Sequence, residues 1–428
     1  MLPTMAHSTG RQGRWVVLQI VALMIAAVGL ARPDGGRADA QSGDDPLLIL
    51  VSFDGFRWDY LDRAPAPNLH RLAARGVRAR GLIPSFPSKT FPNHYTLVTG
   101  LYPGHHGVVA NNMRDVPTGR VFSLSRKAEV RDAMWWTGGT PLWVTAERAK
   151  RRAGTMFWPG SEAVIGGVRP SYWVPYDELM SGIARVDQVL RWLDLPRAQR
   201  PAFVTLYFED TDDAGHSQGP DSGAVRDAVE RVDGYLGRLW QGLEKRGLAQ
   251  RANIVVVSDH GMAAVVPDRV ITLDRFISLD EVDVVDINPT LGLIPAAGKA
   301  DAIYRSLAAA SPYLHVYRRA ETPPAWHYRD HPRIPPIVGV ADEGWRIVKG
   351  TLVDRAVQAV RPPRGEHGYD PSVESMHGIF IAAGPAFKRG VVVPAFENVH
   401  VYDALATALG VTPEKNDGDM AVAKTVLR

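Results

Sequence analysis

The sequence places side chains that bind divalent metals directly after two short apolar runs. Leu47–Phe53 is followed by Asp54, and Asn253–Val257 leads into Asp259 and His260. If both runs are strands of one parallel sheet, their carboxyl ends meet at the edge where ligands bind in such folds. Carboxylate and imidazole groups are ligands of zinc and similar ions. The pattern therefore predicts a metal-binding group at that edge.

A second group of candidate ligands follows the apolar run Ala202–Phe208. Asp212 and His216 are four residues apart, so one helical turn would place them on the same side. His367 lies in a loop just before a further apolar run, Gly378–Ala382. Together with the first group, these residues make three Asp and three His. That set suffices for two ions with open coordination positions, such as zinc.

A two-metal site requires a nucleophile, and Thr90 is the candidate. Pro92 and the residues after it predict a helix that begins near Thr90. The hydroxyl would then lie at the positive end of the helix dipole and could bind a metal, and both effects favour the alkoxide. An ordinary helix N-cap is the alternative role for this residue, and the two roles are compatible.

The cysteine and histidine counts limit the kinds of metal site and nucleophile that the chain can form. The chain has 428 residues with no Cys and 13 His, which excludes disulfides, thiolate nucleophiles, iron–sulfur clusters and Cys-based zinc sites. Its length suits one large α/β domain with insertions, or two to three ordinary domains. The net charge of +3 gives no support for dedicated nucleic-acid binding.

The apolar runs also predict the scaffold. They are short, continuous and bounded by polar or Gly-rich residues, which is typical of buried parallel strands. Between them, Ala224–Leu248 carries apolar residues at helical spacing along one face. Strands that alternate with helices predict an α/β fold, a doubly wound sheet covered on both faces.

Two segments interrupt this alternation. Residues 112–200 hold six of the 11 Trp. We expect an insertion that shapes a pocket, although ordinary core packing is the better explanation for most of these Trp. Residues 267–364 are rich in Pro and Val, and we expect a mixed α/β addition packed on the sheet. Both would belong to one catalytic domain that spans residues 41–428.

The N-terminus has the layout of a secretory signal. Arg11 and Arg14 precede the apolar stretch Trp15–Ala31, and Ala38-Asp39-Ala40 offers a small-residue cleavage site. We expect residues 1–40 to be a signal peptide, and the mature protein to be exported, periplasmic or secreted, without stable membrane association. An uncleaved anchor is the alternative, because the apolar run approaches the minimum length for spanning a membrane.

Longer motifs surround the candidate residues. In chain order they are Lys-Thr-Phe-Pro-Asn-His-Tyr at 89–95, Thr-Gly-Leu-Tyr-Pro-Gly-His-His-Gly at 99–107, Asn-Asn-Met at 111–113, Asp212 with Gly215-His216 and Gly219-Pro220, Ser-Asp-His-Gly-Met at 258–262, and His-Gly-Tyr-Asp at 367–370. This set resembles the nucleotide pyrophosphatase/phosphodiesterase family of the alkaline phosphatase superfamily. The resemblance covers residues 47–388. It implies an alkaline-phosphatase-like fold, with a central mostly parallel sheet flanked by helices and carrying insertions.

The resemblance also divides the ligands between two Zn²⁺ ions. One zinc would be held by Asp54, Thr90, Asp259 and His260, and the other by Asp212, His216 and His367. Thr90 would be the nucleophile, and Asn111 would donate a hydrogen bond to a non-bridging phosphate oxygen. The family usually has Pro before the Asp matched here to Asp212, whereas this chain has Thr211. Asp210 and Asp213 therefore stay open as alternatives for that ligand.

Aromatic side chains are candidates for binding the rest of the substrate. By resemblance, Phe91, Tyr176 and Tyr207 would sandwich a nucleobase, and such stacking tolerates any base. The alternative for Tyr207 is an ordinary strand residue. For the remaining His residues, His94 among them, we expect structural roles.

These expectations describe a zinc-dependent hydrolase of phosphodiester and pyrophosphate bonds in nucleotides. It would release nucleoside 5′-monophosphates through a covalent phospho-Thr90 intermediate. One alternative is a phospholipid head-group or other phosphodiester or phosphomonoester hydrolase of the same superfamily. An alternative of another class is a catalytically inert, metal-bearing binding protein. The expected partner is a small nucleotide substrate, and no protein partner is inferred.

Overall fold

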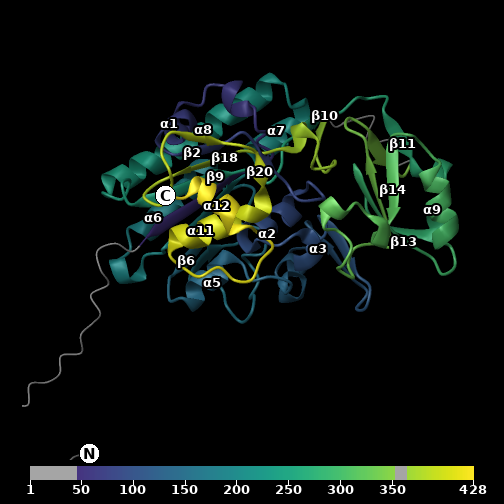
Figure 1. Cartoon of the computed structure of the whole chain (residues 1–428), viewed down its shortest axis with the longest axis horizontal. Helices are drawn as coiled ribbons and strands as arrows, with labels where there is room; N and C mark the ends of the chain where they lie inside the picture. The colour runs from purple at the N-terminus through teal and green to yellow at the C-terminus, as the bar shows by residue number, and fades with distance from the viewer. Residues whose placement is uncertain (1–45, 352–363) are drawn as a thin grey trace, which may run out of the picture. The chain divides into compact units, whose positions relative to one another are not determined.

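An eight-stranded sheet forms the centre of the computed structural model (Figure 1), which describes residues 46–351 and 364–428. The described residues fall in one compact unit, Asp44–Arg428, and the expected signal peptide lies outside them. In spatial order the strands are β19 (Val391–Val393), β2 (Val77–Ala79), β18 (Phe380–Ala383), β9 (Ala252–Val257), β1 (Leu47–Phe53), β8 (Phe203–Phe208), β6 (Ala153–Met156) and β7 (Tyr172–Val174).

The middle of the sheet is parallel. β1 pairs in parallel with β8 on one side and with β9 on the other, so the carboxyl ends of these three strands lie next to one another. β6 continues the parallel arrangement beside β8. The α/β fold with a mostly parallel central sheet is therefore confirmed, and its central edge is where the candidate ligands emerge.

Successive side chains of the strands pack alternately into two separate hydrophobic cores, as expected for a sheet that is covered on both faces. Leu50 and Val255 belong to one core, and Val51 and Val256 belong to the other. The first face is covered by α2 (Thr90–Thr99), α5 (Leu142–Arg148) and α11 (Val401–Leu409). The second is covered by α1 (Pro67–Arg75), α6 (Gly182–Leu193) and α8 (Gly223–Lys245).

The expectation that all four apolar runs are parallel strands is wrong for the last one. β18 pairs antiparallel with both β9 and β2. Its direction follows from the loop that precedes it, because His367 must lie at the carboxyl edge of β1 and β9 to join the other ligands. A strand that starts at that edge runs opposite to the strands that end there.

The Trp-rich segment 112–200 does more than shape a pocket. Its residues 142–193 supply β6, β7 and the covering helices α5 and α6. β6 reads Ala-Gly-Thr-Met and lacks the apolar run by which the other central strands were predicted. Trp135, Trp136 and Trp143 are buried in the core, in line with the packing alternative for these residues.

Residues 267–364 contain a four-stranded antiparallel sheet, here called the accessory sheet. Its order is β12 (Val282–Asp286), β13 (Thr290–Pro295), β15 (Ile337–Ala341) and β14 (Leu314–Arg318). Together with α9 (Ala300–Ala308), drawn in green in Figure 1, it encloses a hydrophobic core of its own. The described part of the segment contains both strands and a helix, and the turn between β12 and β13 contacts the loops of the central sheet.

Candidate active site

The first candidate ligand group comprises Asp54, Asp259 and His260, which emerge from the ends of β1 and β9. Their ligand atoms lie within 4.8 Å of one another, and all three side chains are buried. His260 Nε2 lies 3.0 Å from Asp259 Oδ2 and 3.4 Å from Asp54 Oδ1. The strand ends thus bring these three predicted ligands together, and we call them the first ligand group.

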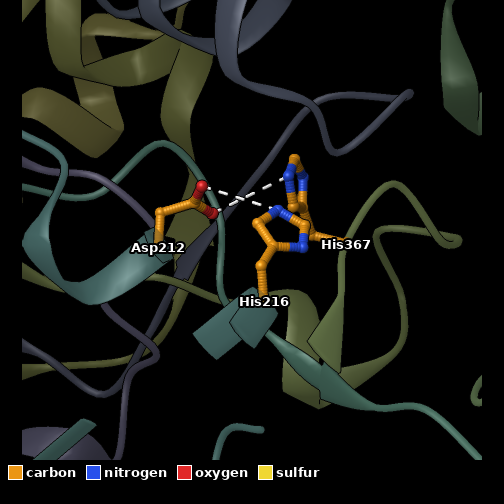
Figure 2. Close-up of side chains that lie close together, drawn as sticks. All are labelled: Asp212, His216 and His367. Carbon is orange, nitrogen blue, oxygen red and sulfur yellow. Dashed lines mark ion pairs between the residues drawn. The ribbon is translucent and has the colours of Figure 1, made fainter. Parts of the chain in front are cut away.

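The second ligand group comprises Asp212, His216 and His367 (Figure 2). Asp212 and His216 lie on one side of the helix α7 (Asp210–Gln218), as their four-residue spacing predicted. His367 follows the short strand β17 (Gly365–Glu366). Figure 2 shows the three side chains pointing toward one another; His216 Nε2 lies 3.5 Å from Asp212 Oδ2, and His367 Nε2 lies 3.8 Å from Asp212 Oδ1.

A glycine allows the two groups to approach each other. Gly55 has φ +64, and a Cβ on this residue would lie 2.9 Å from the Cα of Asp212. Any side chain here would push the end of β1 away from α7. The Gly55 backbone N–H also points to Asp259 Oδ1 at 3.3 Å. Gly55 therefore lies between a ligand of the first group and a ligand of the second.

Backbone carbonyls orient all three histidine rings. The Nδ1 atoms of His216, His260 and His367 lie 2.8–3.0 Å from the carbonyl oxygens of Gly365, Gly261 and Ser88 respectively. A carbonyl only accepts, so each Nδ1 carries a proton, and in the neutral form of each ring Nε2 keeps its lone pair. Metal-binding histidines in proteins are commonly held in this way by the other ring nitrogen. Each Nε2 is therefore prepared to bind a metal.

The carboxylates of the two groups are crowded and incompletely paired. Among the described residues, Asp54 Oδ1, Asp212 Oδ1 and Asp259 Oδ2 are buried oxygens that accept no hydrogen bond. Burial, together with the charges of Asp259 and Asp212, raises the pKa of Asp54 well above its usual value. Burial of negative charge without a partner is costly. A donor set of oxygen and nitrogen atoms with this excess of negative charge fits divalent cations.

The surroundings lower the pKa of one histidine, His367, and of one carboxylate, Asp259. Burial and the neighbouring rings of His260 and His216 lower the pKa of His367 well below its usual value, so this ring is neutral. Burial opposes ionisation of Asp259, but His260 and His94 outweigh it and hold the pKa of Asp259 well below its usual value. A neutral imidazole beside an ionised carboxylate is the form in which both side chains bind a metal.

Thr90 lies where the two groups meet. It is the first residue of α2, and its hydroxyl lies 3.3 Å from His260 Nε2. The His260 ring in turn stacks on the His367 ring, with centroids 3.5 Å apart and an interplanar angle of 10°. Thr90 is not an N-cap, because Lys89 occupies that position. The Thr90 hydroxyl therefore lies beside His260 of the first ligand group, and the His260 ring separates it from His367 of the second.

Asn111 contacts the start of the same helix. Its Oδ1 accepts a hydrogen bond of 2.9 Å from the Phe91 backbone N–H. Because the carbonyl end of the amide is occupied, the Nδ2 end is the one left to donate to a ligand. Asn111 thus contacts the residue that follows Thr90, and a donor of a hydrogen bond to the phosphate would have to lie near this position.

A cavity of about 510 Å³ opens beside Thr90. Its wall includes aromatic side chains from α2, from the end of β8 and from segment 112–200; they are Phe91, Phe157, Trp158, Tyr176 and Tyr207. Of the described lining residues, Lys127 is the one with a cationic side chain. The cavity has the size and composition of a small-molecule site.

The hydroxyl of Tyr207 makes a contact that the sequence did not indicate. It donates a hydrogen bond of 2.7 Å to Asp54 Oδ2, so Tyr207 holds a ligand of the first group. Burial and the charge of Asp54 raise the pKa of this phenol well above its usual value, which keeps the donor proton in place. The family resemblance pointed to Tyr207 only as a candidate for stacking, with an ordinary strand residue as the alternative.

His94, for which we expected a structural role, lies beside the first ligand group. It is fully buried, its Nε2 lies 2.8 Å from Ser52 Oγ, and its Nδ1 lies 2.9 Å from the Thr90 carbonyl oxygen and 3.3 Å from Asp259 Oδ2. Its position four residues after Thr90 on a helix was the available signal, because that spacing places both on one face.

The neighbours of Asp212 occupy other positions. Asp210 pairs with Arg231, with Nε and Oδ1 3.0 Å apart, and Asp213 is exposed at the cavity wall. Neither lies in the second ligand group. Among these three carboxylates, the structure brings Asp212 alone to His216 and His367.

No helix in the described part of the chain is long and apolar enough to cross a membrane.

A mostly parallel α/β sheet that carries two acid-and-histidine groups and a helix-borne hydroxyl at its central edge defines an alkaline-phosphatase-like hydrolase. The family model described as type I phosphodiesterase / nucleotide pyrophosphatase matches residues 48–370, and the chain belongs to this family. The resemblance inferred from the motifs is confirmed. Membership makes the protein a nucleotide pyrophosphatase/phosphodiesterase, and so an enzyme rather than an inert binding protein.

Known relatives cover nearly the whole chain. Human ectonucleotide pyrophosphatase/phosphodiesterase family member 5 is 37% identical over 400 residues, which is 93% of this chain and 80% of that protein. The bis(5′-adenosyl)-triphosphatase enpp4 of Xenopus laevis is 37% identical over 91% of this chain and 83% of its own. Among solved structures, an inactive Thr-to-Ala variant of murine ectonucleotide pyrophosphatase/phosphodiesterase 5 in complex with AMP matches with a TM-score of 0.85 and 37% identity, over 90% of this chain and 100% of that chain.

Removal of divalent metal should lower the thermal stability of the protein. Without a cation, the buried carboxylates of Asp54, Asp259 and Asp212 repel one another, so zinc should raise the unfolding midpoint by binding the folded state alone. A concentration one hundred times the dissociation constant would contribute about 2.7 kcal/mol. Calorimetry with zinc and with a chelator measures this. The shift should shrink in Asp54→Asn and persist in Asp187→Asn, whose carboxylate pairs with Arg238 away from the site; equal shifts in both variants would contradict the assignment.

Tyr207→Phe should separate the two roles of this side chain. The substitution keeps the ring but removes the hydrogen bond to Asp54, and loss of such a partner typically costs about 10- to 100-fold in metal affinity or activity. We expect lower zinc affinity in a chelator competition and lower kcat, with little change in KM. Tyr176→Phe is the matched control, because the Tyr176 ring also lines the cavity. A Tyr207→Phe enzyme with normal zinc affinity would show that the hydroxyl does not hold the ligand.

Proposed function

We propose that this protein hydrolyses phosphodiester and pyrophosphate bonds in nucleotides with two zinc ions, and releases nucleoside 5′-monophosphates through a phospho-Thr90 intermediate. The observation that carries the proposal is that Thr90, His260 and His367 lie next to one another. The Thr90 hydroxyl lies 3.3 Å from His260 of the first ligand group, and the His260 ring stacks on His367 of the second. The inactive Thr-to-Ala variant of the murine relative and its AMP complex support the same reading.

The two ligand groups would each hold one zinc. Thr90 would join Asp54, Asp259 and His260 around the first ion, while Asp212, His216 and His367 would hold the second. Bound there, two divalent ions would neutralise the phosphodiester and hold its attacking and leaving oxygens in line. The donors are all oxygen and nitrogen, because the chain has no Cys, and this set suits zinc.

Thr90 would act as the nucleophile. In the first step the Thr90 hydroxyl loses its proton to solvent, its Oγ1 bonds to phosphorus as the bond to the leaving oxygen breaks, and the leaving oxygen keeps the electron pair. In the second step the oxygen of a water molecule bonds to the phospho-Thr90 phosphorus, the bond to Oγ1 breaks, and Oγ1 takes up one proton of that water, which regenerates the Thr90 hydroxyl. The N-terminal end of α2 favours negative charge on Oγ1 throughout. Asn111, whose Oδ1 is occupied by the Phe91 N–H, would direct its Nδ2 to a non-bridging oxygen.

The aromatic wall of the cavity would hold the nucleoside. Phe91 adjoins Thr90 in the chain, and Tyr176 lies in the same cavity wall, so a base between them would sit within reach of the reacting phosphate. Stacking of one base on an aromatic ring contributes about 1–3 kcal/mol and is indifferent to base identity. Tyr207, which lies in the same wall, would contribute its ring to stacking and its hydroxyl to the hydrogen bond with Asp54.

Thr90→Ala should abolish turnover without unfolding the protein. The substitution removes the protein atom that would bond to phosphorus, whereas the helix keeps its N-cap residue, Lys89. Thr90→Ser is the matched control, since it retains a hydroxyl and should keep measurable activity. Steady-state rates on a nitrophenyl ester of a nucleoside monophosphate, with circular dichroism as the folding check, test both. A Thr90→Ala protein with near-normal rates would rule out Thr90 as the nucleophile.

The enzyme should prefer diesters to monoesters. A monoester presents a third charged oxygen that needs its own donor, and Lys127 is the one cationic side chain among the described lining residues. We expect kcat/KM on the nitrophenyl nucleotide to exceed that on nitrophenyl phosphate by on the order of 10²-fold or more, the effect of one missing charge-stabilising donor. Faster hydrolysis of the monoester, or of glycerophosphocholine, would favour the other substrate classes of the superfamily.

A further inference from the structure

We propose that the turn between β12 and β13 of the accessory sheet aligns Thr90 with the second ligand group, and that Asp286 and Asn288 in this turn are positioning residues for the reaction. The inference rests on the proposed function in taking Thr90 as the nucleophile. Among the described residues, the accessory sheet supplies neither a member of the two ligand groups nor a residue of the cavity wall. Its influence on the chemistry would therefore pass through this turn.

Asp286 forms the first arm of the turn. Its Oδ2 lies 2.5 Å from Lys89 Nζ, and both side chains are buried. The Thr290 hydroxyl donates a further hydrogen bond of 3.0 Å to the same oxygen. A buried ion pair resists separation, because parting the two groups leaves each charge uncompensated. Since Lys89 is bonded directly to Thr90, the start of α2 is tied to the accessory sheet.

Asn288 forms the second arm. Its Nδ2 donates a hydrogen bond of 2.5 Å to Glu366 Oε2, and its Oδ1 accepts one of 3.1 Å from the Ile347 N–H. The other carboxylate oxygen of Glu366 accepts the His367 N–H at 3.2 Å and lies 4.0 Å from His216 Nδ1. Asn288 therefore holds the carboxylate that binds the His367 backbone and lies next to the His216 ring, both in the second ligand group.

The two arms meet in one junction. Ser88 accepts a hydrogen bond from His367 Nδ1 on its carbonyl at 2.8 Å, and its hydroxyl donates to the Tyr369 carbonyl at 2.9 Å. Gly368 has φ +110, and a Cβ there would lie 3.0 Å from Pro289 Cδ and 3.1 Å from Lys89 Cε. The loop before Thr90, the loop that carries His367 and the accessory turn thus pack against one another without room for a side chain at Gly368.

Asp286 and Asn288 make matching contacts, each with a residue next to a site residue, and general packing does not require this match. Asp286 and Asn288 are two residues apart in one turn. Asp286 contacts the residue just before the candidate nucleophile, and Asn288 contacts the residue just before a candidate metal ligand. Each side chain thereby sets the position of a reacting or metal-binding group without touching the substrate. That is the role we assign to them.

Asp286→Asn tests the first arm. Removal of the charge that faces Lys89 should let the start of α2 shift, and misplacement by about 1 Å can cost on the order of 10²-fold in rate. We expect kcat on the nitrophenyl nucleotide to fall by about 10- to 100-fold, with KM and bound zinc unchanged. Asp283→Asn is the control: it makes the same change in the same strand, where the carboxylate pairs with Arg114 at the surface, and it should leave kcat unaltered.

Asn288→Gly tests the second arm. Asn288 has φ +66, which Gly adopts freely, so the variant removes the side chain and keeps the turn. We expect zinc affinity, measured in competition with a chelator, to fall by about 10- to 100-fold at one of the two sites. Excess zinc should then restore kcat in Asn288→Gly but not in Asp286→Asn. A general loss of stability in both variants would not produce this difference between them.

Several outcomes would overturn the inference. It fails if Asp286→Asn loses no more activity than Asp283→Asn, or if Asn288→Gly binds both zinc ions normally. If Asp286→Asn does not fold, the double variant Lys89→Met with Asp286→Asn removes both buried charges, and a normal kcat in it would contradict the positioning role. A wild-type protein that leaves the nucleotide uncleaved would refute the proposed function, while the zinc competition would still report on Asn288.

Discussion

The carboxylates of Asp54, Asp212 and Asp259 are confined to one buried edge of the sheet, and their mutual repulsion is the constraint on which the rest of the structure depends. The protein itself supplies too little positive charge nearby to balance them, as the raised pKa of Asp54 indicates. A fold normally avoids such a cluster, because the cost of unpaired buried charge is a large fraction of its net stability. Under the proposed function, cations bound from solution would neutralise the same cluster and turn its repulsion into a source of stability.

Much of the surrounding structure serves to keep that cluster in place. The parallel pairing of β1 with β8 and β9 brings the ligand-bearing strand ends side by side. Gly55 lets the end of β1 lie against Asp212. The accessory sheet, which has its own core, reaches the same edge through two polar side chains. Elements that are far apart in the sequence therefore act on a region only a few side chains wide.

The parts of the fold and site that could be predicted from the sequence are those with a local signature. The apolar runs located β1, β8 and β9 closely, and the motifs identified the family, because both depend on neighbouring residues. β6 was missed because Ala-Gly-Thr-Met has no apolar run, and the direction of β18 required knowing where His367 lies in space. The Tyr207–Asp54 hydrogen bond and the Asp286–Lys89 ion pair join residues 153 and 197 positions apart, and no pattern within either segment marks such a pair.

The hydrogen bonds that orient the ligands have an evolutionary consequence. His216, His260 and His367 are oriented by main-chain carbonyls, so no side-chain substitution removes these acceptors directly. Asp54 instead relies on the phenol of Tyr207, which a single codon change removes. Drift at position 207 is therefore a route by which the surroundings of Asp54 can change while the three histidines keep their backbone partners.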